Sequence, residues 1–245
     1  MPGLLDVYHR LPYPAKVLAA GARGLFLNRW RYDEHSESLV SEFLSHERWS
    51  NEQWDRWQEE RIAFVLERAA RRVPFYRDQW SKRRRLGDRA AADMLENWPV
   101  LAKEALRRHP RAFLADDCNP KAMFVEHTSG TTGTPLHVWL GRKTVVAWFA
   151  LFEARARRWH GVSRNDRWAI LGGQLIAATG RDRPPFWVWN GALKQLYLSA
   201  YHLKPDHVAD YLDALDKHEV CYLLGYPSGI YQLAREALEQ RLNVP

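Results

Sequence analysis

The sequence predicts an α/β protein: a mainly helical part over residues 1–120, then a layered mixed β-sheet with flanking helices over residues 121–245. Apolar residues recur at helical spacing in the first part. Short apolar runs alternate with amphipathic helices in the second part, and glycine or proline separates them. With 245 residues, 46% of them hydrophobic, the chain is long enough to bury a substantial core.

The clearest helix of the first part begins after Ser50, because Gln53 follows it at the spacing of a capping box. Apolar residues then recur three to five positions apart until Pro74 ends the helix. We expect one face of this helix to join the core through Trp54, Trp57, Ile62, Val65, Leu66, Ala69 and Val73.

Residues 1–30 alternate apolar and basic groups, which leaves two roles for the apolar side chains. They either dock onto the body of the protein, which we favour, or lie on a membrane surface. The side chains concerned are Val17, Leu18, Leu25, Phe26 and Trp30.

The second part has a regular order of predicted elements. Glycine follows several of the apolar runs, and proline precedes the last two helices, as expected of strand ends and helix starts. The elements are strands at 122–126 and 136–140, a helix at 144–159, strands at 167–171 and 196–199, a helix from Pro205, a strand at 220–224 and a final helix that starts at Pro227 and Ser228.

The formal net charge of +7 is compatible with a nucleic acid, an acidic membrane surface or an anionic small substrate as partner. The basic run at 82–85 is typical of a solvated helix face, with an anionic partner as the alternative. No RNP pattern, zinc-finger spacing or basic region with heptads accompanies the charge, so no nucleic-acid partner is expected.

Cysteine spacing bears on disulfide bonds and metal sites, and hydropathy bears on the cellular location of the protein. Cys118 and Cys221 form no CxxC pair, so neither a disulfide framework nor a metal site is predicted. The sequence has no transmembrane segment by length of apolar run, and its first residues do not match a signal peptide. We therefore expect a cytoplasmic protein.

The segment HTSGTTGTPL, residues 127–136, has two interpretations. Its glycines and threonines suit a hairpin turn. Alternatively, Gly130 and Gly133 allow positive φ, so that successive backbone N–H groups converge on a phosphate while the side-chain hydroxyls add donors. It is not a Walker A loop, because counting from Gly130 places Pro135 where the second glycine is required and Leu136 where the lysine is required.

This segment resembles the phosphate-binding signature of the adenylate-forming (ANL) superfamily, most closely its phenylacetate-CoA ligase/CapK-like branch. Further segments resemble that branch in the same order. The resemblance extends over most of this chain. It covers only the N-terminal half of such an enzyme, so the fold that it implies is an incomplete adenylation (acyl-CoA synthetase-like) large domain. These segments are VPFYR at 73–77, WPVLAKEALR at 98–107, LSAYHL at 198–203 and LLGYPSGIYQLA at 223–234.

The resemblance implies ATP-dependent adenylation of a small carboxylic acid, with Mg²⁺ as cofactor, followed by transfer of the acyl group to coenzyme A or another nucleophile. Many relatives have a lysine after the proline of the loop. Leu136 stands there in this chain, so that positive charge would have to come from elsewhere. The positions that would hold the β- and γ-phosphates are Ser129, Gly130, Thr131, Thr132, Gly133 and Thr134.

The resemblance also places Gly225, Tyr226, Pro227 and Ser228 beside the acyl-substrate pocket, with plain strand-to-helix packing as the alternative. Ser228 does not fit a nucleophile elbow, because GxSxG requires glycine where Tyr226 stands. His127 either orients a loop hydroxyl and contacts substrate, or has a structural role.

The family's adenine and ribose contacts, its magnesium-binding acidic residue and its C-terminal lysine all come after the region that this chain resembles. We therefore assign no catalytic residue from the sequence. Either a missing C-terminal half or a partner chain supplies these groups, or the chain is a truncated, noncatalytic remnant. A basic nucleic-acid-binding module is a further alternative.

Overall fold

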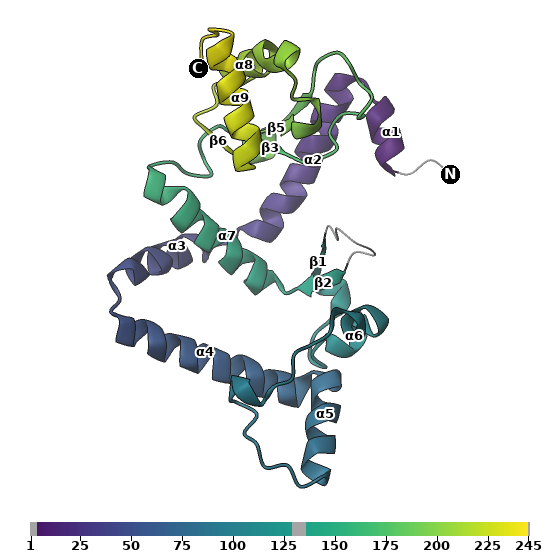
Figure 1. The fold of residues 1–245 in the computed structure, drawn as a ribbon, viewed down its shortest axis with the longest axis vertical. Helices are drawn as coiled ribbons and strands as arrows, with labels where there is room; N and C mark the ends of the chain where they lie inside the picture. The colour runs from purple at the N-terminus through teal and green to yellow at the C-terminus, as the bar shows by residue number, and fades with distance from the viewer. Residues whose placement is uncertain (1–3, 129–135, 245) are drawn as a thin grey trace. The chain divides into compact units, whose positions relative to one another are not determined.

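The computed structural model describes residues 4–128 and 136–244, and Figure 1 labels the main helices and strands. Contacts between residues divide the chain into two units. The unit formed by residues 1–40 and 149–245 is called the sheet unit here, and residues 41–148 form the helical unit. The boundaries fall inside α3 (Ser36–Ser45) and α7 (Arg142–Ala156).

The sheet unit is built on a four-stranded mixed sheet in the order β4-β5-β3-β6. β3 (Trp168–Gly172) is parallel to β5 (Gln195–Ser199) on one side and to β6 (Tyr222–Gly225) on the other. β4 (Trp187–Asn190) is antiparallel to β5. The predicted mixed sheet is confirmed, whereas β4 lies in a segment for which the sequence predicts no strand.

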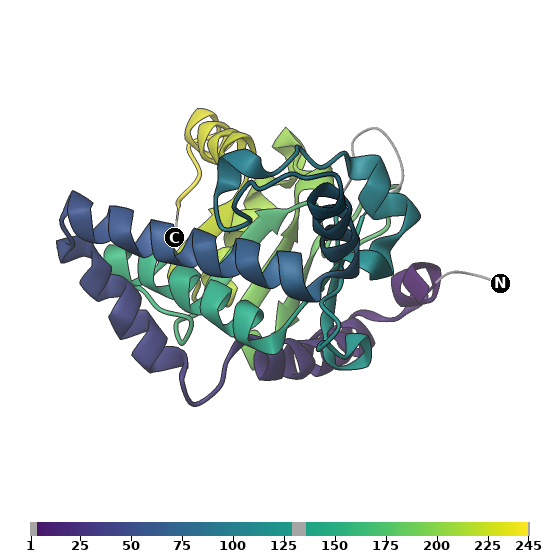
Figure 2. The same ribbon diagram turned by 90° about the horizontal axis from the view of Figure 1, so that it is seen from below.

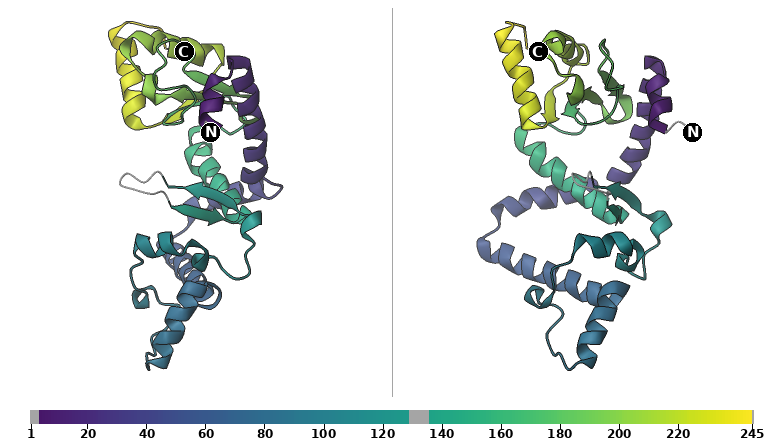
Figure 3. Two further views of the ribbon diagram at one scale, coloured as in Figure 1. Left: turned by 90° about the vertical axis from the view of Figure 1, so that its right-hand side faces the viewer. Right: turned by 45° about the vertical axis from the view of Figure 1, so that its right-hand side comes forward.

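Helices cover both faces of this sheet. α8 (Val208–Lys217) and α9 (Pro227–Glu239) pack on one face, and α2 (Tyr13–Arg31) lies on the opposite side, against β4 and the 3₁₀ turn after it (Figure 3). With both faces covered, β3 is apolar along its whole length rather than alternating. The core includes Leu171, Leu198, Tyr211, Leu212, Leu233 and Ala237.

α2 packs against the four-stranded sheet as predicted, but through a different face from the one that the sequence indicated. Gly24 and Leu27 are buried, while Leu18 is 74% exposed and Leu25 is exposed as well. A side chain at position 24 would collide with the amide of Asn190, so only glycine allows this approach. α1 (Leu4–Arg10) precedes α2, and His9 Nε2 donates to the carbonyl of Leu175 at 2.8 Å.

The helical unit contains α4 (Asn51–Arg72), the long helix in Figure 2, followed directly by α5 (Pro74–Arg85). The predicted capping box is present: Gln53 N donates to Ser50 Oγ at 3.3 Å, and Ser50 N donates to Gln53 Oε1 at 2.9 Å. The remaining elements of this unit are α6 (Lys103–Arg108), β1 (Phe124–His127) and β2 (His137–Leu140).

The expected core role of the apolar face of α4 is wrong. No residue of α4 is buried, and Val65 is 56% exposed. Trp54 and Trp57 instead pack around the buried ring of His46, with ring centroids 5.6 and 6.3 Å away. The helix has α5 and one 3₁₀ turn as its main neighbours in this unit, and these cover only part of the apolar face.

Part of the basic run at the end of α5 has a structural role. Arg83 forms an ion pair with Asp88 at 2.5 Å and donates to the carbonyl of Asn97 at 2.6 Å. Arg84 donates to the carbonyls of Asp88 and Ala90 at 2.9 and 2.7 Å. These bonds fasten the irregular segment after α5, so the run is more than a solvated face.

Eight short 3₁₀ turns complete the described chain, and they connect the longer elements. No described helix has both the length and the apolar character needed to cross a bilayer. The turns are η1 (His46–Arg48), η2 (Leu95–Asn97), η3 (Pro110–Phe113), η4 (Pro120–Ala122), η5 (Arg158–His160), η6 (Gly191–Leu193), η7 (Ala200–His202) and η8 (Pro205–His207).

Tyr211→Phe tests the polar bond inside this core. Tyr211 is fully buried and its hydroxyl donates to the carbonyl of Ser199 at 2.6 Å. Removing the hydroxyl leaves that carbonyl without its partner, which costs about 1–3 kcal/mol of unfolding free energy. Urea unfolding should show this loss, whereas Tyr231→Phe, at an exposed position, should leave stability unchanged. Equal stability of both variants would contradict the role of the bond.

Tyr222 is expected to make the unfolding free energy depend on pH in the alkaline range. Its hydroxyl donates to the carbonyl of Ser163 at 3.2 Å, and burial raises the pKa of Tyr222 from 10.0 to about 12. Because the folded state keeps the hydroxyl protonated, this contribution to stability is complete below pH 10 and is lost as the pH rises to about 12. The unfolding free energy of wild type should therefore fall more steeply across this interval than that of Tyr222→Phe. Parallel curves would contradict the assignment.

Candidate functional site

The hydroxyl-rich loop connects the two strands of an antiparallel hairpin. β1 and β2 pair from Phe124 opposite Leu140 to His127 opposite His137, as the left view of Figure 3 shows. Two more bonds extend the pairing beyond the strands: Thr128 N donates to the carbonyl of Leu136 at 3.1 Å, and Leu136 N donates to Thr128 Oγ1 at 3.0 Å. The predicted strands on either side of the loop are thus confirmed, with small shifts in their bounds.

The predicted phosphate-binding positions themselves lie outside the described residues. The hairpin determines where the loop begins and ends, because the bonds between Thr128 and Leu136 hold its two ends side by side. The positions concerned are Ser129, Gly130, Thr131, Thr132, Gly133 and Thr134.

A pair of histidines stands at the loop end of the hairpin. His127 is the last residue of β1 and its ring meets that of His137 edge to face, with centroids 4.4 Å apart. Both side chains are exposed. Imidazole nitrogens can donate to or accept from a ligand. His137 was not singled out from the sequence, although its place opposite His127 follows from a hairpin register.

Gly225, Tyr226, Pro227 and Ser228 form the junction between β6 and α9 in the sheet unit. Gly225 is needed for packing, because a Cβ there would lie 2.5 Å from the carbonyl oxygen of Leu171 on β3. Pro227 occupies the first turn of α9, as predicted, and Tyr226 precedes it without a side-chain cap. Tyr226 is 63% exposed and Ser228 is exposed too, so both are available to a ligand.

This junction lies at the carboxyl edge of the parallel strands, where α/β sheets commonly bind their ligands. β3 ends there at Gly172, and β5 leads into a turn that carries Tyr201, 56% exposed. A Cβ at Gly173 would lie 3.4 Å from Tyr201 Oη, so the ring stands over the strand end. Tyr201 and Tyr226 thus supply exposed aromatic surface at this edge. Sequence analysis missed Tyr201, although the paired glycines after β3 indicated a strand end.

The predicted residues fall into two separate groups. The loop and His127 belong to the helical unit, and the junction at 225–228 belongs to the sheet unit. Within the described part of the chain, no cluster of histidine, cysteine or acidic side chains is arranged to hold a metal ion.

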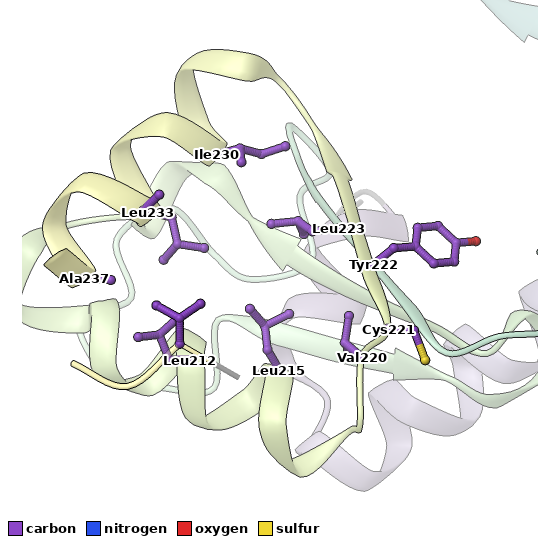
Figure 4. A pocket seen from close by; sticks show the side chains of 11 residues that line it. Leu212, Leu215, Val220, Cys221, Tyr222, Leu223, Ile230, Leu233 and Ala237 are labelled. Atoms are coloured by element: carbon purple, nitrogen blue, oxygen red, sulfur yellow. The ribbon is translucent and has the colours of Figure 1, made fainter. Parts of the chain in front are cut away.

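An apolar cavity of about 240 Å³ lies between α8, α9 and β6. Figure 4 shows Leu212 and Leu215 of α8 and Leu233 of α9 around it, while the ring of Tyr222 points away. Its lining is almost entirely aliphatic, and none of the predicted site residues belongs to it. The cavity is therefore largely apolar, with Cys221 and Tyr222 as its polar side chains.

The chain is similar to Protein CapK of Staphylococcus aureus. The two are 22% identical over 243 residues, which cover 97% of this chain and 51% of CapK. The chain thus spans about half the length of this curated relative. No family model matches the chain, and no solved structure matches it.

Gly225→Ala tests the close approach of β6 to β3. The added methyl group meets backbone rather than a flexible side chain, so we expect a loss of about 1–3 kcal/mol of unfolding free energy. Gly21→Ala in α2 is the control, because nothing lies within 4 Å of a Cβ there. That substitution should raise stability by about 0.5–1 kcal/mol, because alanine favours helix. Urea unfolding followed by circular dichroism measures both, and an unaffected Gly225→Ala would contradict the contact.

Proposed function

We propose that this chain is the N-terminal part of an adenylate-forming enzyme of the phenylacetate-CoA ligase/CapK-like kind. Such an enzyme activates a carboxylic acid with ATP. The carboxylate oxygen forms a bond to the α-phosphorus of ATP, the α–β phosphoanhydride bond breaks, and pyrophosphate leaves with the bonding electron pair. The acyl-AMP then passes its acyl group to coenzyme A or another nucleophile.

The observation that carries the proposal is the segment HTSGTTGTPL at the end of the β1–β2 hairpin. The ladder holds Thr128 and Leu136, the residues that flank the segment, side by side. The two glycines of the segment would allow backbone N–H groups to point to one side, which suits a polyphosphate. Similarity to CapK over nearly the whole chain supports the same assignment.

The chain's own residues would contribute mainly by position and charge. Backbone N–H groups at Gly130 and Gly133, with the hydroxyls of Thr131 and Thr132, would hold the β- and γ-phosphates, whose charge Mg²⁺ would help to neutralise. His127 and His137, whose ring centroids lie 4.4 Å apart at the end of the hairpin, would donate to the same phosphates. Tyr201 and Tyr226, at the carboxyl edge of the sheet, are the groups that we propose for the acid.

Binding of MgATP tests the role of the loop directly. We expect Thr131→Ala combined with Thr132→Ala to weaken MgATP binding at least about tenfold, because two hydroxyl donors to charged oxygens are lost. Thr179→Ala, at an exposed threonine of the sheet unit, is the control and should bind like wild type. Tryptophan fluorescence or calorimetry measures the affinity. Equal affinity of the double variant and wild type would exclude the loop.

Pyrophosphate exchange separates an enzyme from a remnant. The 245-residue chain and any longer protein encoded by the same open reading frame should be compared for exchange between ATP and pyrophosphate that depends on a carboxylic acid. Exchange that falls steeply in the double loop variant supports an adenylating enzyme. MgATP binding without exchange in either protein favours the noncatalytic remnant, and absence of both overturns the proposal.

A further inference from the structure

The sheet unit contains a second polar site, away from the carboxyl edge of its sheet. It is a cavity of about 250 Å³ between the end of α2, the segment after α7 and the turn that precedes β5. Four cationic side chains line this cavity, and no acidic residue of the described chain does so. The four are Arg31, Arg157, Arg164 and Lys194.

Arg157 is held rigidly at the inner wall. Its side chain is 3% exposed, and Nη1 donates to Glu153 Oε2 at 3.0 Å. The guanidinium carbon lies 4.9 Å from the ring centroid of Trp168, which also lines the cavity. The packing and the ion pair together leave this guanidinium little freedom to rearrange.

Arg164 is fixed by an aromatic ring and a carboxylate. Its guanidinium carbon lies 4.0 Å from the ring centroid of Tyr32, and Nη2 donates to Glu37 Oε1 at 3.2 Å. Its backbone N–H donates to Glu153 Oε1 at 3.0 Å. The side chain is 21% exposed, so it is partly accessible to solvent.

Two donors of this cluster have no acceptor. Arg157 Nε and Arg164 Nη1 are buried and make no hydrogen bond in the structure. Buried donors of charged groups normally have partners, because an unmade bond carries the full cost of desolvation. A ligand that brings oxygen atoms into the cavity would relieve part of that cost.

Positive charge exceeds negative charge around the cavity. Glu153 and Glu37, the carboxylates that pair with Arg157 and Arg164, also pair with Arg158, at 3.1 and 3.3 Å. Neither carboxylate lines the cavity, whereas four cationic side chains do. A multivalent oxyanion such as phosphate or pyrophosphate suits such a lining better than a monovalent anion.

The mouth of the cavity is formed by exposed residues. Lys194 has a left-handed backbone with φ of 48° at the end of η6, and its Nζ donates to the carbonyl of Asn165 at 2.6 Å. Both residues are exposed, so an anion can enter from solvent past a lysine. The site thus combines an accessible mouth with a fixed guanidinium wall.

We propose that this cavity binds a small multivalent oxyanion of the phosphate class, with pyrophosphate or inorganic phosphate as its simplest forms. Guanidinium groups at fixed positions match the oxygen geometry of phosphate, and a lysine adds a point charge at the entrance. All the residues that line the cavity belong to the sheet unit, and the site does not depend on the function proposed for the loop at 129–134.

Calorimetric titration of the 245-residue chain with pyrophosphate and with phosphate tests this site, without Mg²⁺ and at constant ionic strength. Saturable binding is expected, with acetate binding much more weakly. Arg164→Gln and Lys194→Gln should each weaken pyrophosphate binding about tenfold, since each removes a charge-assisted bond. Arg183→Gln is the matched control, because it removes an exposed charge of the same unit and should bind like wild type. Lys194→Gln replaces an exposed side chain, so it keeps the test valid should Arg164→Gln fail to fold.

The loop variant distinguishes this proposal from the proposed function. Thr131→Ala with Thr132→Ala should leave pyrophosphate binding without Mg²⁺ unchanged while MgATP binding falls. The cavity assignment is overturned by any of three results: no saturation in wild type, equal losses in Arg183→Gln and the cavity variants, or loss of binding in the loop variant alone.

Discussion

β3 is hydrogen-bonded to a parallel strand on each side, and this pairing positions the rest of the sheet unit. The backbone N–H and C=O groups of β3 are hydrogen-bonded to β5 and β6. Its side chains can therefore be apolar on both faces of the sheet and be covered by helices. The same pairing brings Gly225 against the backbone of Leu171, where a side chain has no room. The carboxyl edge, with its exposed tyrosines, follows directly from this parallel arrangement.

A second constraint is the fully buried carboxylate of Glu153. A buried charge is tolerated only with close partners, and here Arg157, Arg158 and the backbone N–H of Arg164 all donate to it. These bonds tie α7 to the segment that leads into β3. They also hold guanidinium groups around a cavity in which their charge is only partly neutralised, and this imbalance is the physical basis of the proposed oxyanion site.

The two candidate binding regions differ in kind. In the proposed function, the loop at 129–134 would bind a polyphosphate through backbone N–H groups and hydroxyls. The cavity depends on side-chain charge held by packing. The two regions use different groups on different units, so their ligands can be examined with different substitutions.

The sequence by itself determined the features that depend on local spacing. These include the capping box at Ser50, the strands around the hydroxyl-rich loop and the start of α9 at Pro227. Only the tertiary structure decided which face of α2 is buried, where β4 pairs, why Gly225 must be glycine and how the arginines surround Glu153. The apolar face of α4 predicted a core and was misleading, because spacing shows that a face is apolar but not what covers it. The features that only the tertiary structure decided share one physical reason. They arise from contacts between residues far apart in the chain, which spacing along the sequence does not encode.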